Sequence, residues 1–265
     1  MNIRQALLVG GVHGNELNGI FLVKKFEQPR FRSLIQRSHV TTSTMLANPG
    51  AIAICQRYVD MDLNRCFRAK DLDDCSLQGH EQTCAKAIAQ TLKHQSPDFV
   101  MDLHTTTANM GVTLLLASNH PFNLALAAYL SEGNEWVKVL HVTSTQSDGR
   151  LRALCPLGLT LEAGPIAQGS LDARLFFQTE QIIFKILDYI NAWNQGQPLT
   201  TPDICTIYDH IDTLDFPRSA TGDISAMVHP QLHGHDYHAL HPGDPLFIDF
   251  DGNVTCYEGE KTVYP

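Results

Sequence analysis

The sequence lacks several features that would place the protein at a membrane or in an oxidising compartment. It has no apolar run of about 18 residues or more, so no membrane-spanning helix is expected. Its start, Met-Asn-Ile-Arg-Gln, lacks the basic-then-apolar plan of a signal peptide. The 7 cysteines include no CxxC pair, which argues against a disulfide framework or a Cys-cluster zinc site. These absences predict a cytoplasmic protein with reduced thiols and no membrane partner.

Positive charge is also scarce. Lys and Arg number 19 against 28 Asp and Glu, which gives a net charge of −9 over 265 residues. Broad nucleic-acid binding needs a basic stripe and is therefore not expected. Apolar residues make up 43% of the chain, too many for a disordered protein. Histidine is frequent, with 13 residues, and imidazole is a common metal ligand.

The front of the chain alternates between strand-like and helix-like segments. The expected strands are 6–9, 40–46, 99–103, 112–116 and 157–161, and the expected helices are 15–26, 79–92, 121–130 and 171–193. Such alternation predicts an α/β domain in which helices cover a sheet. For the last helix we expect Ser170 as the N-cap, with Gly196 and Pro198 ending it.

The sequence pattern changes after Pro198. Short apolar runs at 204–208, 226–229, 245–250 and 254–257 are separated by Gly, Pro and Asp. Asp251-Gly252 is a hairpin signal. We therefore predict a large domain over 1–198 and a small β-rich domain over 199–265.

The first motif with chemical content follows the first strand. In Gly-Gly-Val-His-Gly-Asn-Glu, His13 and Glu16 are three residues apart, a spacing that puts two side chains on one face of a helix. A His and a carboxylate are two members of the His₂Glu set that leaves zinc an open position. Alone, the motif is more typical of a capping glutamate beside a chance histidine, whereas the strand-turn-helix context and the flanking glycines favour a metal site.

Two more motifs lie at the ends of apolar strands. Asp102-Leu103-His104 ends one, and open α/β sheets bind ligands at the carboxyl ends of strands. Asp102 is expected on the same face as His104, where it would orient that ring. Glu162 ends another strand, just before a Gly-Pro turn. By itself His104 fits a satisfied core histidine, and Glu162 fits a helix-capping partner as well as a general base.

A fourth motif lies in a long irregular stretch, Arg57-Tyr-Val-Asp-Met-Asp-Leu-Asn-Arg65. Two arginines in an acidic protein indicate carboxylate binding, because the guanidinium fork matches a carboxylate. A solvated loop is the alternative, and it is a serious one for Arg57.

Taken together, the motifs HGNE, DLNR, DLH and LEAGP, in that order, resemble the aspartoacylase/succinylglutamate desuccinylase family of zinc amidohydrolases. The likeness covers essentially the whole chain, through His-Pro-Gly-Asp-Pro at 241–245 to Thr-Val-Tyr-Pro at the end. It implies a carboxypeptidase-like mixed sheet flanked by helices, with a small β-rich C-terminal domain that narrows the active-site entrance.

The resemblance also implies roles for particular residues. His13, Glu16 and His104 would hold one Zn²⁺ per chain. Glu162 would act as general base and later as general acid, and Arg57 would polarise the scissile carbonyl. The chemistry agrees, because zinc lowers the pKa of its water towards 7 and a nearby carboxylate can accept the proton.

The substrate implied by the resemblance is a small N-acyl amino acid, foremost N-acetyl-L-aspartate, bound by Asn64, Arg65, Arg152 and Tyr264. Because the chain carries a net charge of −9, these arginines must create a local positive potential to admit an anion. A homodimer is expected from the family alone.

Departures from the family pattern leave alternatives open. Thr105 stands where relatives usually carry Asn, and Asp148 stands near the position of a substrate-binding Tyr. The alternatives are a deacylase for N-succinylglutamate or for N-acetylated aromatic amino acids, a metallocarboxypeptidase, and a non-catalytic zinc-binding protein. Histidines cluster at 229–241, but their spacing does not favour a second metal site.

Overall fold

The computed structural model describes residues 2–142, 149–197, 199–202 and 204–265. Its chain forms two compact units. The larger contains the described residues up to Thr107 together with Gly111–Asp209, and the smaller contains Ala108–Met110 and His210–Pro265. The division that we expected after residue 198 stays a prediction, and Pro198 itself lies outside the described residues.

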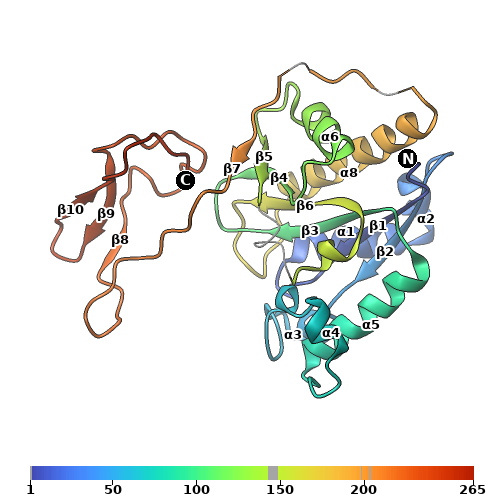
Figure 1. The fold of residues 1–265 in the computed structure, drawn as a ribbon, viewed down its shortest axis with the longest axis horizontal. Coiled ribbons are helices and arrows are strands. Elements are labelled where there is room, and N and C mark those ends of the chain that lie inside the picture. Colours follow the sequence, from blue (N-terminus) through green and yellow to red (C-terminus); the bar gives the residue numbers. More distant parts are fainter. Residues whose placement is uncertain (1, 143–148, 198, 203) are drawn as a thin grey trace. The chain divides into compact units, whose positions relative to one another are not determined.

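The larger unit is built on a seven-stranded mixed sheet, confirming the predicted fold class (Figure 1). The strand order is β2-β1-β3-β6-β4-β5-β7, with β4 antiparallel to β6 and every other neighbouring pair parallel. The strands are β1 (Gln5–Gly10), β2 (Thr41–Leu46), β3 (Phe99–Thr105), β4 (Gly111–Leu116), β5 (Val137–His141), β6 (Leu157–Gly164) and β7 (Tyr208–Asp209).

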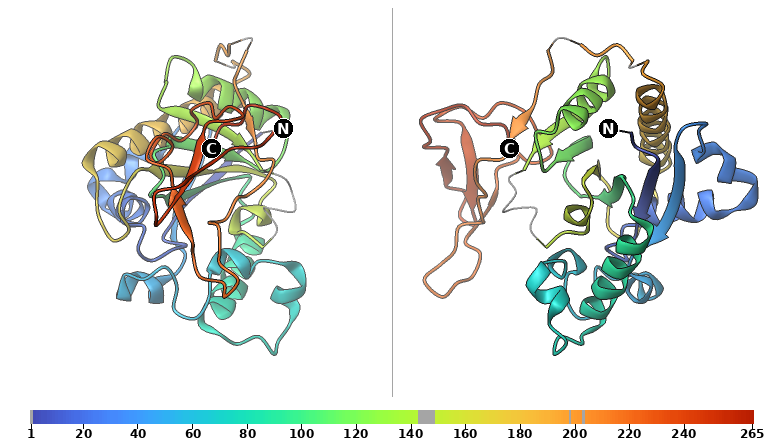
Figure 2. Two further views of the ribbon diagram at one scale, coloured as in Figure 1. Left: turned by 90° about the vertical axis from the view of Figure 1, so that its left-hand side faces the viewer. Right: turned by 45° about the vertical axis from the view of Figure 1, so that its right-hand side comes forward.

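Helices lie on both faces of this sheet (Figure 2). The α-helices are α1 (Leu17–Glu27), α2 (Pro29–Arg32), α3 (Pro49–Ile54), α4 (Ala69–Asp73), α5 (His80–Gln95), α6 (Pro121–Ser131) and α8 (Ala173–Asn194). The 3₁₀ turns are η1 (Ser33–Ile35), η2 (Leu63–Arg65) and η3 (Leu151–Leu154).

Alternation along the strands divides the interior into two cores. In β1, Ala6 and Leu8 face a core shared with α1, α6 and α8, whereas Leu7 and Val9 face a second core shared with α5 and η3. Successive strand residues point to opposite faces, so this is the expected division for a strand buried on both sides. The same rule places the even-numbered residues of β3, which include the predicted ligand His104, on the α5 face.

Most predicted elements of this unit form, with three differences. Helix α8 is capped by Asp172, whose carboxylate accepts from Leu175 N at 2.7 Å, and not by Ser170. Strand β5 was not expected. The run at 204–208 was expected as a strand of the small domain. Only its last residue lies in a strand, β7, and β7 pairs with β5 in the large sheet. Strands of five and two residues are too short to show a clear periodicity.

The smaller unit holds a three-stranded antiparallel sheet in the order β10-β9-β8, which confirms the predicted β-rich character. Its strands are β8 (Ala226–Val228), β9 (Pro245–Asp249) and β10 (Val254–Cys256). The predicted hairpin joins β9 to β10, and Gly252 has a φ of +88°, a conformation that glycine adopts without strain. In the described parts of both units, no helix is long and apolar enough to cross a membrane.

Candidate metal centre and active site

Three adjacent parallel strands bring the predicted chemistry to one edge of the large sheet. β1, β3 and β6 run in the same direction, so their carboxyl ends meet at one edge. In the register between β3 and β6, His104 lies directly opposite Glu162. Paired residues on neighbouring parallel strands point to the same face, so both side chains lie on the α5 face.

His13 and Glu16 lie in the turn between β1 and α1, not on one face of a helix as predicted. Helix α1 begins at Leu17, and Glu16 is its N-cap residue. The turn is tight, since Glu16 N donates to the His13 carbonyl at 3.3 Å. At Gly14 a Cβ atom would lie 2.1 Å from the Ala51 carbonyl carbon, so only glycine lets this turn pack against α3.

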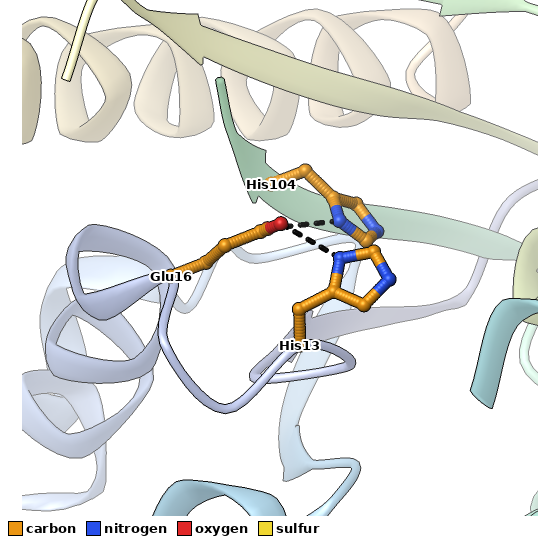
Figure 3. A group of neighbouring side chains, drawn as sticks. All are labelled: His13, Glu16 and His104. Atoms are coloured by element: carbon orange, nitrogen blue, oxygen red, sulfur yellow. Dashed lines mark hydrogen bonds and ion pairs between the residues drawn. The ribbon is translucent and has the colours of Figure 1, made fainter. Parts of the chain in front are cut away.

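The two histidines and the glutamate form one buried cluster, which we call the metal-ligand set (Figure 3). His13 Nδ1 lies 2.7 Å from Glu16 Oε1, and His104 Nδ1 lies 3.0 Å from Glu16 Oε2. The ligand atoms all lie within 4.8 Å of one another, and the residues are only 3–5% exposed. Two imidazole nitrogens and a carboxylate converging on one point are a donor set that fits Zn²⁺ and leaves a coordination position open.

The outer nitrogen of each histidine faces a second carboxylate. His13 Nε2 lies 3.0 Å from Asp62 Oδ1, and His104 Nε2 lies 3.0 Å from Asp102 Oδ2. Metal-binding histidines characteristically give their second nitrogen to a carboxylate, which fixes the tautomer and the ring orientation. The orienting role expected of Asp102 is therefore supported by its position. Sequence reasoning did not single out Asp62 as a partner of His13, although it stands in the DLNR motif.

Electrostatics within the set favour an ionised Glu16. Burial by itself would raise the pKa of Glu16, but the charge of His104 and hydrogen bonds with both histidines outweigh burial and lower it to about 2. Burial would likewise lower the pKa of His104, yet Asp102 and Glu16 raise it well above its usual value. The carboxylates of this cluster therefore stabilise positive charge next to them, as a site for a cation must.

Glu162 has the opposite electrostatic character. Burial raises its pKa; the charge of His104 opposes that rise, whereas Glu16 and Asp102 reinforce it. A carboxyl with a raised pKa beside a metal site is suited to taking up and returning a proton near neutral pH.

Arg57 lies in an exposed loop, and its guanidinium contacts the metal-ligand set and Asp62. Its Nη2 donates to Asp62 Oδ2 at 3.1 Å, and its Nη1 lies 3.7 Å from Glu16 Oε1. The Arg57 carbonyl accepts from Gly14 N at 3.3 Å, which ties the arginine to the β1–α1 turn. The side chain is 47% exposed, so the guanidinium also reaches solvent, where a substrate would arrive.

Asn64 is a buried connector, 6% exposed, in the 3₁₀ turn η2. Its Nδ2 lies 3.4 Å from His104 Nε2, and its Oδ1 accepts from Leu151 N at 3.1 Å. Arg65 Nη1 donates to the Asn64 carbonyl at 2.9 Å. The DLNR motif thus joins the metal-ligand set to the segment that carries the next arginines.

Two arginines in that segment differ in their surroundings. Arg152, the predicted substrate ligand, is 7% exposed, and burial lowers its pKa against smaller contributions from Cys155 and Asp102.

Arg150 instead shares its electrostatic environment with the site. Burial lowers its pKa, Arg65 lowers it further, and Glu162 opposes the change. Its buried Nε has no hydrogen-bond partner among the described residues, and the same holds for Arg152 Nε. Because the charges of Arg65 and Glu162 both act on Arg150, it is a candidate to bind an anionic group together with Arg65. Sequence reasoning did not single out Arg150. The sequence feature that points to it is its position two residues before Arg152.

Two predicted features do not lie in the described part of this unit. Tyr264 belongs to the smaller unit, so its contact with substrate and the narrowing of the entrance stay predictions. Asp148 lies outside the described residues. Among the described residues the metal-ligand set is the one group that could hold an ion, so the histidines at 229–241 do not form a second metal site there.

Comparison with known families matches both units. A family model described as the succinylglutamate desuccinylase/aspartoacylase catalytic domain matches residues 2–190. A second, described as the AstE/AspA barrel-sandwich hybrid domain, matches residues 203–265.

Similar proteins extend over the whole chain. A protein of Acaryochloris marina named "Probable aspartoacylase" is 46% identical, over 100% of this chain and 90% of the relative. A mouse protein named "N-acyl-aromatic-L-amino acid amidohydrolase (carboxylate-forming)" is 38% identical, over 97% of this chain and 83% of the relative. The crystal structure of murine aminoacylase 3 superposes with a TM-score of 0.92 at 36% identity, covering 100% of this chain and 89% of that one.

Proposed function

Because this chain belongs to the succinylglutamate desuccinylase/aspartoacylase family and is an amide hydrolase, we propose that it is a zinc enzyme that cleaves N-acetyl-L-aspartate to acetate and L-aspartate. The observation that carries the proposal is the position of Glu162, opposite His104 in the sheet register and beside a buried His-Glu-His set. Structural zinc closes its fourth position and needs no neighbouring base, so a purely structural metal leaves Glu162 and Arg57 without a role.

His13, Glu16 and His104 would hold the metal. A bound Zn²⁺ supplies Lewis acidity, which makes water a better nucleophile at neutral pH and polarises the amide carbonyl. Asp62 holds the His13 ring through a hydrogen bond at its outer nitrogen, and Asp102 faces the outer nitrogen of His104 as an ion-pair partner at 3.0 Å.

Glu162 moves the proton. Its carboxylate accepts a proton from the attacking water and returns it to the amide nitrogen, so that the amine leaves neutral and the C–N bond breaks. The raised pKa favours both halves of this transfer, since a very acidic carboxyl would accept the proton poorly. Arg57, at the solvent side of the metal-ligand set, stabilises the negative charge that develops on the carbonyl oxygen.

Arg65 and Arg150 bind the carboxylates of the substrate. The two arginines repel each other in the free protein, and an anion bound between them reduces this repulsion. The reduction contributes to the free energy of substrate binding. A substrate with two carboxylates uses both cations, whereas an N-acylated aromatic amino acid has one carboxylate to offer. Arg152 stays a predicted ligand, and Asn64 supports Arg65 through its carbonyl.

A substrate panel tests this proposal. Purified protein is stripped with a chelator, reloaded with Zn²⁺, and assayed against N-acetyl-L-aspartate, N-succinyl-L-glutamate and N-acetyl-L-phenylalanine. We expect zinc to restore hydrolysis, with the highest kcat/KM on N-acetyl-L-aspartate. Preference for the phenylalanine derivative would replace the acidic assignment with the aromatic one, and zinc binding without turnover of any substrate would favour a non-catalytic zinc protein.

Arginine variants sharpen the substrate assignment. Arg65→Ala or Arg150→Ala should change the ratio of kcat/KM for N-acetyl-L-aspartate over N-acetyl-L-phenylalanine by about tenfold or more, the effect of one lost charged hydrogen bond. Arg152→Ala is the matched variant two residues away. If only Arg152→Ala changes the ratio, the clamp is Arg152, as the sequence predicted. The cytoplasmic location and the homodimer also stay predictions, to be checked by fractionation and by light scattering.

A further inference from the structure

One buried carboxylate near the site has no role in the chemistry described above. Glu81 lies in the first turn of α5 and is 0% exposed. An acidic residue there usually contributes to the helix N-terminus. The Glu81 carboxylate is instead bonded to a different part of the chain, the segment between Arg57 and Asp62.

The carboxylate accepts three consecutive backbone N–H groups of that segment. Val59 N donates to Oε1 at 2.7 Å, and Asp60 N and Met61 N donate to Oε2 at 2.9 and 3.2 Å. The segment returns one bond, since His80 N donates to Asp60 Oδ2 at 2.7 Å. Backbone N–H groups of the segment therefore donate to a side chain of α5, and a backbone N–H group of α5 donates to a side chain of the segment.

A second connection runs from Glu81 to the turn that carries His13. Asn48 Nδ2 donates to Glu81 Oε1 at 3.0 Å, and Asn48 N donates to the Gly11 carbonyl at 3.0 Å. Asn48 is 0% exposed and also caps α3, where Ala51 N donates to its Oδ1 at 3.3 Å. Glu81 thus joins the segment to the same turn on which the metal-ligand set is built.

Apart from these bonds, the segment is held by the Arg57 carbonyl, which accepts from Gly14 N at 3.3 Å, and by Met61, which packs against the core on the α5 face. The side chains of Tyr58 and Val59 are each 42% exposed, so apolar burial contributes little there. Arg57 and Asp62, at its two ends, carry the contacts to Glu16 and His13. A segment of this kind is fixed by its polar bonds, and a buried carboxylate with four N–H donors provides the strongest of them.

We infer that Glu81 is a positioning residue, whose buried carboxylate fixes the 59–61 backbone and so places Arg57 beside the metal-ligand set. Its part in catalysis rests on the proposed function, whereas its hold on the segment does not. Glu81 contacts none of the three metal ligands, so its loss should leave zinc bound in the metal-loaded enzyme and lower turnover through Arg57.

Glu81→Gln tests the inference. The side-chain NH₂ of glutamine takes the place of one carboxylate oxygen, and it cannot accept a hydrogen bond from the backbone N–H groups that donate to that oxygen. The matched control is Glu180→Gln, the same change at another buried glutamate, which pairs with Lys25. Hydrogen exchange, measured on zinc-loaded protein without substrate, should quicken about tenfold at the amides of Val59, Asp60 and Met61 in Glu81→Gln only. Unchanged exchange there, or equal quickening in the control, overturns the inference.

Kinetics separate positioning from general damage to the fold. On the best substrate, Glu81→Gln should lower kcat by about 10- to 100-fold, the cost of misplacing a catalytic group by about 1 Å, with zinc content retained. In an Arg57→Ala background the same change should cost far less, because the group that it positions is already gone. An undiminished loss in that background would show that Glu81 acts by another route.

If the wild-type enzyme hydrolyses no substrate of the panel, the proposed function fails and the exchange measurement still decides whether Glu81 holds the segment. If hydrolysis is found and exchange does not change, the inference fails alone.

Discussion

The metal-ligand set and the segment from Arg57 to Asp62 meet at one site but are held there in different ways. His13, Glu16 and His104 are 3–5% exposed; His104 stands in β3, and His13 and Glu16 stand in the buried turn that joins β1 to α1. The segment is irregular, largely exposed, and bound through backbone N–H groups to Glu81. One part of the site is fixed by the sheet, and the other by a few polar bonds.

The two ways of fixing the residues correspond to two tasks of the site, metal binding and contact with the substrate. Metal ligands must keep their geometry to within fractions of an ångström, which packed strands provide. Groups that meet the substrate lie at the solvent side, where loops on a rigid scaffold commonly carry binding residues. Changes in the strand-borne part should therefore abolish chemistry, and changes in the segment should lower its rate.

The largest effect is expected from His104→Ala, which removes a ligand on β3. Zinc should be lost and activity should fall to the uncatalysed level, well beyond the 10- to 100-fold of an outer partner. Metal analysis and kcat/KM are the measurements. His141→Ala, at a histidine on β5 whose Nδ1 pairs with Asp209, is the matched control and should keep its zinc. Retained zinc and turnover in His104→Ala would remove this histidine from the metal-ligand set.

The next largest effect is expected from Glu162→Gln, which keeps the shape of the side chain and removes proton transfer. We expect kcat to fall by about 10²- to 10⁴-fold with zinc content unchanged. Glu180→Gln, at a buried glutamate away from the site, should retain activity. Undiminished turnover in Glu162→Gln would exclude it as the general base.

A smaller effect is expected from Asp62→Asn, at the point where the segment touches the metal-ligand set. The pKa of Asp62 would rise on burial, but hydrogen bonds from His13 and Arg57 lower it well below its usual value, so the ionised carboxylate is the natural partner of His13. Zinc affinity or turnover should fall by about 10- to 100-fold. Asp209→Asn, at the comparable carboxylate beside His141, should change neither. Equal effects at both positions would refute a special role for Asp62.

The smallest effect is a pH dependence of stability at Glu81. Burial alone would raise the pKa of Glu81, but hydrogen bonds from Val59, Asn48, Asp60 and Met61 lower it from 4.5 to about 2. A lowered folded-state pKa contributes stability above the unfolded value, and this contribution is lost as pH falls towards the folded value. The difference in unfolding free energy between wild type and Glu81→Gln should therefore shrink by about 1–2 kcal/mol from pH 5 to pH 3. Denaturant titrations at the two pH values measure it, and a constant difference would contradict the burial of an ionised Glu81.

The strands were the most predictable part of the fold, because buried parallel strands are short apolar runs. The strand expected at 99–103 forms the core of β3 (Phe99–Thr105), and that expected at 6–9 forms the core of β1. The N-cap of α8 was predicted wrongly because Ser170 and Asp172 are both good caps, and the local turn decided between them. Strand β7, of two residues, has no pattern to detect.

The sequence by itself determined which residue types make the chemistry: a histidine and a glutamate after the first strand, a second histidine and a glutamate at two strand ends, and arginines in an irregular stretch. Order and spacing suffice for this, because three of the motifs lie at the ends of apolar strands and the fourth lies in a long irregular stretch.

Only the tertiary structure decided how these residues meet. The register that puts Glu162 opposite His104, the carboxylates behind each ring and the hydrogen bonds from the 59–61 backbone to Glu81 all join residues far apart in the chain. Hydrogen bonds and charge interactions depend on distances of a few ångströms in space, and packing of the sheet and helices sets those distances.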